Sequence, residues 1–560
     1  MQLSRWIVVS LAQVLCAELI SSDELGGSTC LSDGHCMQSI SNASASSQYF
    51  WPHAMGHPQH YGKSPYTGKF SSSQCNLAAH LKWSWHHPDG RYDTMVMSAP
   101  VIDGEKNLYL VIFHGINKFS PDGRILWSWD VPGLVQDGSN SEYLLHGPAL
   151  MDGRIFTCSA GFTVYSLDME TGQVVWATQV NASNGPSTDN ANLVARDGRV
   201  LIAADRDESL RHKPNKVVCL NGTSGDVLWE FWPDTGVWNF LPLWPQAGGV
   251  SDGTIVFQGI SGSAYRVNLT SGKQIWRAGK LAGEATFTDG GAAMGPNGVL
   301  YTVSHLSDHV PFNSKRGGLH AFQVSNGQLL WERTDFKYGV FTYPVIAQLD
   351  ENGPLTVVTG VGSLTGFPLW FVCAIWIVLF FIGLLFKMVL VIWRRLKGEA
   401  ASGQHAFWKR TVFWFIVSGV GWFSLIFGWA VPFSYPYSIH AFTAETGRPL
   451  WQVQLPTWHW PGCASCDANL AGRLRKMRSR PIELPIVQSY PTVDSRGVVY
   501  FTRADGYIYS IKDWNHDGTI DAEKEVCTFH TGSSGLVAGP SIAPGMLAVA
   551  TIDSLYIFGD

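Results

Sequence analysis

Apolar residues recur at every second position in short segments along most of the chain, which is the period of a half-buried β-strand. Segments such as VYSLDMETG, AYRVNLTSG, LHAFQVSNG and IHAFTAETG each run into a turn that ends in glycine. A further strand pair lies upstream of each, for example APVIDGEKNLYLVIF and SYPTVDSRGVVYFT. The pattern therefore predicts a series of four-stranded antiparallel meanders.

In six of these units a tryptophan follows the turn glycine by four residues. The tryptophans are Trp127, Trp176, Trp229, Trp276, Trp331 and Trp451, at intervals of 49, 53, 47, 55 and 120 residues. A regular interval of this length indicates a repeat architecture. The last interval equals one ordinary repeat plus roughly 70 residues, about the size of two membrane-spanning helices and a short loop.

There are eight upstream strand pairs, which indicate eight units. They begin near Ala99, Gly147, Asn190, Gln246, Gly290, Thr342, Ser489 and Ala538. The eighth unit ends at LYIFGD, one strand short, while His80 to Trp85 form an orphan strand before the first unit. Pairing these two ends would close a ring, so the fold class is predicted as all-β, an eight-bladed β-propeller. The competing interpretation is an open β-sandwich array. It explains neither the orphan strand before the first unit nor the strand that the eighth unit lacks.

The long interval holds two uncharged apolar runs, Phe367 to Phe386 and Thr411 to Phe433. Each is long enough to cross a bilayer as a helix. The loop between them, residues 394–410, is rich in Arg and Lys, as short cytoplasmic loops are. We therefore expect a transmembrane hairpin over residues 364–436, inserted in the sixth blade, with the propeller on the far side of the membrane. A pair of buried core helices is the alternative.

The N-terminal residues agree with that topology. Residues 1–17 have the charge, apolar core and small residues of a signal peptide. Residues 18–78 are polar and without period, and predict a linker, so that the propeller occupies 79–363 and 437–560. Four glycosylation sequons lie on the expected lumenal side, at Asn42, Asn181, Asn221 and Asn268.

Eight cysteines lie outside the signal and the first apolar run, an even number that suggests disulfides in a secretory compartment. They are Cys30, Cys36, Cys75, Cys158, Cys219, Cys463, Cys466 and Cys527. The pairing cannot be deduced from sequence. Cys463 and Cys466 form a C-x-x-C for which a structural disulfide is favoured over a redox or zinc site, because no second ligand pair is evident.

The segment DWNHDGTIDAEKE resembles a calcium loop. Asp513, Asn515, Asp517, Thr519 and Asp521 stand at alternate ligand positions, with Gly518 at the sharp turn. Position 12 is Lys524 instead of glutamate, and Glu525 is one substitute. A calcium site and a metal-free turn rich in Asp and Asn both remain open.

Composition narrows the function. The chain has 560 residues, 58 Gly, 24 Trp and a net charge of -5, which gives no sign of a nucleic-acid partner. No nucleophile, base and orienting group stand at a recognisable spacing, so no catalytic residue is nominated.

The repeat with a turn glycine and a following tryptophan resembles that of the pyrroloquinoline-quinone (PQQ) type eight-bladed propellers, the fold of quinoprotein alcohol dehydrogenases. That resemblance covers about residues 79–363 and 437–560 and is specific for fold rather than chemistry. Quinoprotein enzymes usually carry an adjacent Cys-Cys pair beside a calcium-bound quinone, and this sequence has none. A bound quinone is therefore not expected.

A secretory signal, a glycosylated propeller and a membrane hairpin inside one blade also resemble the propeller-bearing plant Gamete Expressed membrane proteins. This resemblance implies a multi-pass plasma-membrane glycoprotein that acts by binding an unknown protein or cell-surface ligand, as a developmental protein in pollen tube guidance and early embryogenesis. A quinone-dependent membrane dehydrogenase acting on alcohols or sugars is the alternative function, and the endoplasmic reticulum membrane the alternative location.

Overall fold

The computed structural model describes most of residues 49–559, and residues 1–48 and 560 lie outside that part. The longer internal gaps cover 68–76, 89–95, 133–142, 181–192, 205–215, 233–247, 280–290, 307–315, 459–488, 534–538 and, apart from isolated helical positions, 363–434. The predicted signal peptide, the sequons Asn42 and Asn181, and the pair Cys463 and Cys466 therefore lie outside the described residues.

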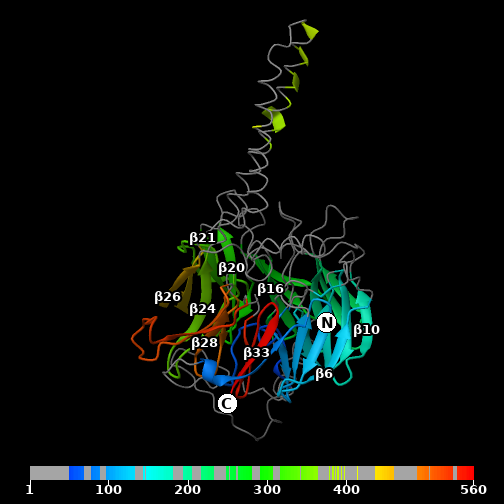
Figure 1. Cartoon of the computed structure of the whole chain (residues 1–560), viewed down its shortest axis with the longest axis horizontal. Coiled ribbons are helices and arrows are strands. Elements are labelled where there is room, and N and C mark those ends of the chain that lie inside the picture. Colours follow the sequence, from blue (N-terminus) through cyan, green and yellow to red (C-terminus); the bar gives the residue numbers. More distant parts are fainter. Residues whose placement is uncertain are drawn as a thin grey trace, which may run out of the picture. The chain divides into compact units, whose positions relative to one another are not determined.

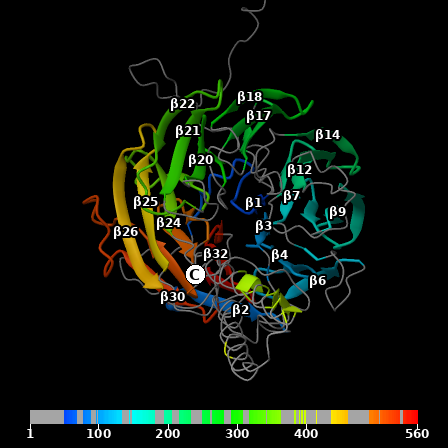
Figure 2. The same cartoon turned by 90° about the horizontal axis from the view of Figure 1, so that it is seen from above.

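The described chain from residue 49 onward contains eight antiparallel sheets arranged as a ring, which confirms the eight-bladed propeller (Figure 2). We number the blades along the chain. Blades 1 to 4 contain β3 (Val101–Asp103), β4 (Leu108–Ile112), β5 (Gly115–Phe119), β6 (Ile125–Asp130); β7 (Ala149–Met151), β8 (Arg154–Cys158), β9 (Thr163–Asp168), β10 (Val174–Gln179); β11 (Val194–Arg196), β12 (Arg199–Ala204), β13 (Lys216–Asn221), β14 (Val227–Phe231); and β15 (Gly248–Val250), β16 (Thr254–Gln258), β17 (Ala264–Asn268), β18 (Gln274–Ala278).

Blades 5 to 8 contain β19 (Ala293–Met294), β20 (Val299–Leu306), β21 (Arg316–Gln323), β22 (Leu329–Arg333); β23 (Val345–Gln348), β24 (Leu355–Gly362), β25 (Tyr435–Thr443), β26 (Pro449–Trp458); β27 (Thr492–Val493), β28 (Val499–Thr502), β29 (Tyr507–Ile511), β30 (Val526–His530); and β31 (Ser541–Ala543), β32 (Met546–Ala550), β33 (Ser554–Gly559), β2 (Leu81–His86). Two short elements precede the ring, β1 (Tyr49–Trp51) and the 3₁₀-helix η1 (Leu77–His80).

The position of a strand in its blade explains whether buried and exposed residues alternate along it. Every residue of β4 and β5 is buried, since each face of an inner strand packs on a neighbouring blade. The outermost strand β6 alternates half-buried Trp127 and Trp129 with exposed polar residues. In the third strands quoted for the period-2 pattern, such as β9 and β17, the polar positions are nearly all buried as well.

The ring closes as predicted from the orphan strand. β2 pairs with β33 in antiparallel register, with Leu81 opposite Phe558 and His86 opposite Ser554. The red β33 accordingly lies beside blue N-terminal strands (Figure 1). The eighth blade thus joins both ends of the described chain, so no blade edge remains open at the junction.

The repeated glycine and tryptophan form a contact between neighbouring blades. Gly272 of blade 4 has a φ of 69°, and a Cβ added there would lie 2.6 Å from the indole of Trp229 in blade 3. The Trp229 Nε1–H donates to the carbonyl of Leu269 in the same turn, at 2.9 Å. Equivalent bonds run from Trp83, Trp127, Trp176, Trp276 and Trp331 to Pro121, Met169, Gly222, Val324 and Ala444. Each such tryptophan therefore docks on the turn of the following blade.

The predicted insertion lies between two paired strands of blade 6. The chain leaves β24 at Gly362 and returns in β25, where Tyr437 stands opposite Gly362. The expected hairpin, 364–436 with its loop 394–410, lies almost entirely outside the described residues. Among the positions that are described, no helix is long and apolar enough to cross a membrane.

The segment assigned to a linker differs from that expectation. Within residues 18–78, residues 49–67 are described and contain the buried side chains of Trp51, Met55 and His60. Composition alone predicted a polar linker here, with possible disulfides at Cys30, Cys36 and Cys75. These side chains are buried because the segment runs along the inside of the ring, where the blades surround it.

Candidate functional site

Residues 49–67, which we name the inner strap, pass along the inside of the ring and touch its blades in order. β1 of the strap adds a fifth strand to blade 1 by pairing with β3, and Figure 2 shows β1 inside the ring of blades. Innermost strands then donate backbone N–H groups to the strap one at a time. The donors and acceptors are Leu150 to Pro52 (2.9 Å), Met294 to Gln59 (3.0 Å), Ile346 to Tyr61 (2.9 Å) and Val493 to Gly62 (2.9 Å), followed by Gly545 of blade 8 to Thr67 (3.1 Å).

Apolar side chains fix the strap in the channel. Met55 packs with Ala99, Tyr343 and Tyr490, which come from the starts of blades 1, 6 and 7. Trp51 is fully buried, and the turn behind it requires Gly56, whose φ is 85° and where a Cβ would lie 2.9 Å from the indole. Only glycine lets the chain fold this closely over the ring.

Three histidines occupy the middle of the strap. His53 and His60 are fully buried and His57 is half-buried. The rings of His53 and His60 have their centroids 6.2 Å apart. His53 Nε2 accepts the N–H of Ala195 in blade 3, at 3.1 Å, so the neutral ring carries its proton on Nδ1. Neither that Nδ1 nor either ring nitrogen of His60 has a hydrogen-bond partner in the described part of the chain.

Burial keeps these rings neutral. It lowers the pKa of His60 to about 4, with the nearby His57 adding to the effect, and lowers that of His57 to about 4. The pKa of His53 falls well below its usual value through burial, reinforced by His60, His57 and Arg196. The strap is therefore compatible with the ring only when its histidines are uncharged.

The strap also decides whether a quinone could fit. A propeller encloses a central channel, the concave feature it offers to a small ligand. Here the inner strap runs along the innermost strands of the ring, and its Trp51, Met55 and His60 are buried. A planar cofactor would have to displace them, and the sequence has no adjacent Cys-Cys pair to cover it. The absence of a bound quinone stays a prediction.

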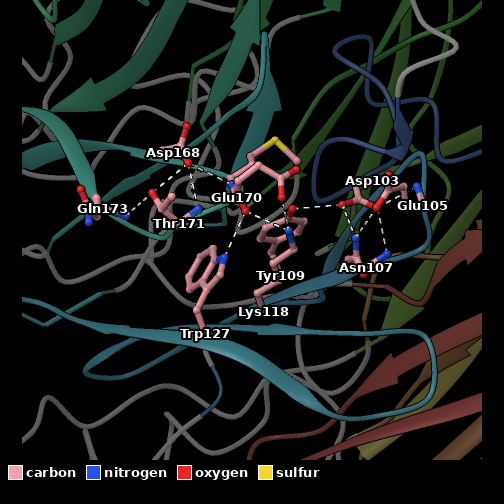
Figure 3. A network of polar contacts seen from close by, with 11 residues as sticks. Asp103, Glu105, Asn107, Tyr109, Lys118, Trp127, Asp168, Glu170, Thr171 and Gln173 are labelled. Carbon is pink, nitrogen blue, oxygen red and sulfur yellow. Dashed lines mark hydrogen bonds and ion pairs between the residues drawn. The ribbon is translucent and has the colours of Figure 1, made fainter.

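A network of polar contacts joins blades 1 and 2 (Figure 3). Asp103 accepts the N–H of Asn107 (2.8 Å) and the hydroxyl of Tyr109 (3.0 Å). The pKa of Tyr109 is raised, chiefly by burial and then by Asp103. Lys118 donates from Nζ to the carbonyl of Met169 in blade 2 at 2.9 Å, as the indole of Trp127 does at 3.1 Å.

These contacts satisfy a buried charge and a buried hydroxyl without leaving a reactive group. Asp494 and Tyr500 repeat the same carboxylate–phenol contact in blade 7, at 3.2 Å. A contact found at equivalent turns of two blades belongs to the repeat. We assign the network to packing rather than to chemistry.

One Ser–His–Glu arrangement lies in blade 5. Ser304 Oγ is 3.0 Å from His320 Nε2, and Glu332 Oε2 is 3.5 Å from His320 Nδ1. The order matches a hydrolase triad. However, Ser304 is 1% exposed, in the middle of the sheet opposite Gly318. A substrate cannot reach its hydroxyl, so the arrangement stabilises the blade.

The calcium-like loop replaces the turn between β29 and β30 and is held by its own backbone. Asp513 accepts the N–H groups of Asp517 (3.2 Å) and Gly518 (2.9 Å). Buried Glu525 accepts those of Trp514 (2.9 Å) and Asp521 (2.8 Å). Among the described residues, no group of three or more His, Cys, Asp or Glu side chains is placed to hold a metal ion.

Hydrogen bonds also set the charge of the two outer carboxylates. Contacts from the hydroxyl and N–H of Thr519 lower the pKa of Asp517, while the N–H of Glu523 and the ammonium of Lys524 lower that of Asp521. Lys524 lies 3.1 Å from Asp521, in the position where a calcium loop has its glutamate. The turn is thus complete without a metal, and calcium binding stays a prediction.

We expect calcium to bind this loop only in the millimolar range, because Lys524 takes the place of the bidentate ligand. Replacing it, Lys524→Glu, should raise affinity by about 10-fold or more, and Asp517→Ala should remove binding in either background. Calorimetric titration of the purified protein measures this. A heat signal unchanged by both substitutions would place the calcium elsewhere.

The two described sequons occupy equivalent turns. Asn221 Oδ1 accepts the N–H groups of Thr223 (2.8 Å) and Ser224 (3.3 Å), and Asn268 Oδ1 accepts that of Ser271 (2.8 Å). Asp168 uses its carboxylate in the same way in blade 2. The asparagines are therefore explained as turn residues, and glycosylation of their Nδ2 atoms stays a prediction.

The cysteines divide into two kinds. Cys527 is disulfide-bonded, and its partner lies outside the described residues. Cys158 donates its thiol to the carbonyl of Ser159 at 3.3 Å, and Cys219 is a buried thiol whose pKa burial raises to about 12. The even cysteine count suggested disulfides, and Cys158 and Cys219 are instead thiols in the packed interior of blades 2 and 3.

Sequence comparison identifies the type of repeat. A family profile described as outer membrane protein assembly factor BamB matches residues 114–239 and 209–338. Tetrathionate hydrolase of Acidianus ambivalens is 37% identical over 115 residues, 19% of this chain and 21% of that protein. BamB of Yersinia pestis is 26% identical over 257 residues, 43% of this chain and 58% of that protein. The chain thus spans about a fifth and somewhat more than half of these two relatives.

Structural comparison agrees on the fold. Quinohemoprotein alcohol dehydrogenase of Comamonas testosteroni has a TM-score of 0.54 at 12% identity, covering 93% of this chain and 81% of that one. BamB of Moraxella catarrhalis has a TM-score of 0.46 at 12% identity, covering 86% and 99%. The protein is therefore an eight-bladed propeller with BamB-like, PQQ-type repeats. Its ring resembles those of quinoprotein dehydrogenases in fold.

Proposed function

We propose that this protein works by binding, as a propeller scaffold, and not as a quinone-dependent enzyme. The observation that carries this proposal is the inner strap, which runs along the innermost strands of the ring and buries Trp51, Met55 and His60. Ser304, the one described serine within a Ser–His–Glu arrangement, is inaccessible. The resemblance to BamB, named as an assembly factor, is consistent with a scaffold role.

Adding quinone tests this directly. The full chain, purified in detergent, should show no new absorbance band with PQQ and calcium, and no dye reduction with alcohols or sugars. Apo-quinoprotein dehydrogenase treated in parallel is the positive control. A stoichiometric quinone spectrum with dye reduction would establish the dehydrogenase alternative and end the scaffold proposal.

We propose further that residues 364–436 anchor the propeller in the plasma membrane as a two-helix hairpin. Gly362 and Tyr437 are paired neighbours, as the two ends of an inserted hairpin must be. Lys and Arg gather in the loop 394–410, which places that loop in the cytoplasm and the propeller outside. A disulfide at Cys527 suits an extracytoplasmic compartment.

Protease protection tests the topology. In intact cells, external protease should cut the propeller and leave a tag inserted in 394–410 protected, and glycosidase should shift the mass of the chain. The same tag, followed by microscopy, separates the plasma membrane from the endoplasmic reticulum. Cleavage of the loop tag in unpermeabilised cells would reverse the topology.

The biological setting that the resemblance implies is plant gametophyte function, in pollen tube guidance and early embryo development. Binding surfaces of rigid scaffolds are usually loops. Glycans at Asn221 and Asn268 would shield blades 3 and 4, so we place the partner near blade 7, around Asp517 and Asp521. Charge reversal at these two positions should impair function without preventing surface delivery.

A further inference from the structure

The inner strap is held in a way that differs from the rest of the ring. β1 has ladder pairing only with blade 1. Beyond it, single N–H groups from blades 2, 5 and 6, those of Leu150, Met294 and Ile346, hold strap carbonyls. The end of the strap is held more firmly, because Val493 of blade 7 both donates to Gly62 and accepts from Ser64. The part around the histidines, between β1 and this bridge, is therefore held by separate bonds. A segment held by separate bonds can detach from the inner strands without breaking any bond within a blade. The ring itself is closed independently, by β2 and β33.

The middle of the strap lacks a counter-charge. The charged group of the ring that acts on His53 is Arg196, from β11, and it disfavours a second positive charge. His57 acts on His60, and both act on His53, in the same sense. Carboxylates act on the two ends of the strap, Asp103 and Asp152 on Tyr49 and Asp494 on Lys63. Arg196 is itself paired with Asp197, at 2.9 Å. Among the described residues, no carboxylate acts on the three histidines themselves.

We propose that the inner strap is an acid-releasable plug of the propeller channel, with His53, His57 and His60 as the trigger. Protonation places up to three like charges in a buried site beside a guanidinium. Release moves those charges into water and leaves the inner N–H groups of Leu150, Met294 and Ile346 facing an open channel. This inference goes beyond scaffold binding, and it can fail while the quinone result stands.

The direction of the pH effect follows from the difference in histidine pKa between the bound and the released strap. The bound strap holds its histidines at a pKa near 4 for His57 and His60, while a released, hydrated histidine has a pKa of about 6.5. Above pH 6.5 neither state gains a proton, and the strap stays bound. As the pH falls from 6.5 towards 4, histidines of the released strap are protonated while those of the bound strap stay neutral. The equilibrium therefore shifts towards release. At pH 5 each such histidine favours release by about 30-fold.

Hydrogen exchange with mass spectrometry tests the proposal on the full chain between pH 8 and 4.5, with labelling times scaled for intrinsic exchange. At pH 5 the strap and the innermost strands β7, β19 and β23 should exchange at least 10-fold faster than at pH 7.5, while the outer strand β10 should not change. Strap protection that persists at pH 4.5 would overturn the proposal.

Substitutions assign the effect to the three histidines. The triple change His53→Gln, His57→Phe and His60→Phe keeps the acceptor to Ala195 and the ring stacking on Tyr61, and should hold the strap at pH 5. The matched control is His516→Gln on the exposed calcium-like loop, which should behave like the unaltered protein. A triple variant that opens at the same pH as the control would reject the trigger.

A single substitution covers the case in which the triple variant fails to fold. Arg196→Gln removes the positive charge beside His53 and should move the opening to lower pH. Opening at an unchanged or higher pH would contradict the electrostatic mechanism, whatever the triple variant does.

Discussion

Truncating the chain after Asp553 should abolish the folded ring. β33 lies between β2 and β32, so its loss removes two strand pairings and separates the two ends of the described chain. The deleted residues include Leu555, Ile557 and Phe558, which are all buried. Burying a side chain of this size contributes about 1.5–3 kcal/mol. Together they approach the total stability of a typical protein, about 5–15 kcal/mol.

Size-exclusion chromatography and tryptophan fluorescence of the truncated protein measure this loss. A synthetic peptide of residues 554–560 added during refolding should restore part of the native signal, because it supplies the missing strand in trans. The control is Leu126→Ala, which shortens an exposed apolar side chain of blade 1 and should unfold like the unaltered protein. A truncated chain that unfolds cooperatively at the original midpoint would show that ring closure is dispensable.

The blade count could be predicted because glycine and tryptophan recur at a fixed spacing for a physical reason. Each tryptophan packs on the turn glycine of the next blade, as Trp127 does on Gly172. A contact between neighbouring blades that recurs in six of the eight blades leaves a periodic trace in the sequence. Trp83 makes the same contact from the closing strand. It precedes the first repeat in the sequence, so it is not part of the regular series of glycine and tryptophan.

The inner strap could not be predicted in the same way. Its hydrogen bonds go to a different blade every few residues, so no period of 2 or 3.6 arises. Its polar residues are buried because the ring surrounds them, which is a tertiary effect. The available signal was the presence of Trp51, Met55 and Tyr61 in a segment otherwise typical of a linker.

The calcium-like loop shows where sequence matching leaves two interpretations open. Ligand spacing alone cannot distinguish carboxylates that face a cation from carboxylates that face backbone N–H groups. Asp513 and Glu525 accept such N–H groups within the loop itself. Alternating acidic residues around a sharp turn satisfy either arrangement, and only the coordinates separate them.

Gly272→Ala should destabilise the protein by about 2–4 kcal/mol, from two separate costs. A φ of 69° is unfavourable for alanine, at about 1 kcal/mol or somewhat more. The new methyl group would also lie 2.6 Å from the Trp229 indole, which must shift and weaken its hydrogen bond to Leu269. A displaced ring and a buried N–H without its acceptor account for the remainder.

Gly253→Ala, in the same blade, is the matched control. Its φ is 74°, yet no atom lies within 4 Å of the added Cβ, so it measures the backbone cost alone. Denaturant unfolding of the two variants therefore isolates the docking contact as their difference, expected at about 1–3 kcal/mol. In a Trp229→Leu background, the two glycine substitutions should destabilise the protein by nearly equal amounts. The indole that only the substitution at Gly272 would contact is then absent. If the difference survived the loss of the indole, the glycine would be required for a reason other than tryptophan docking.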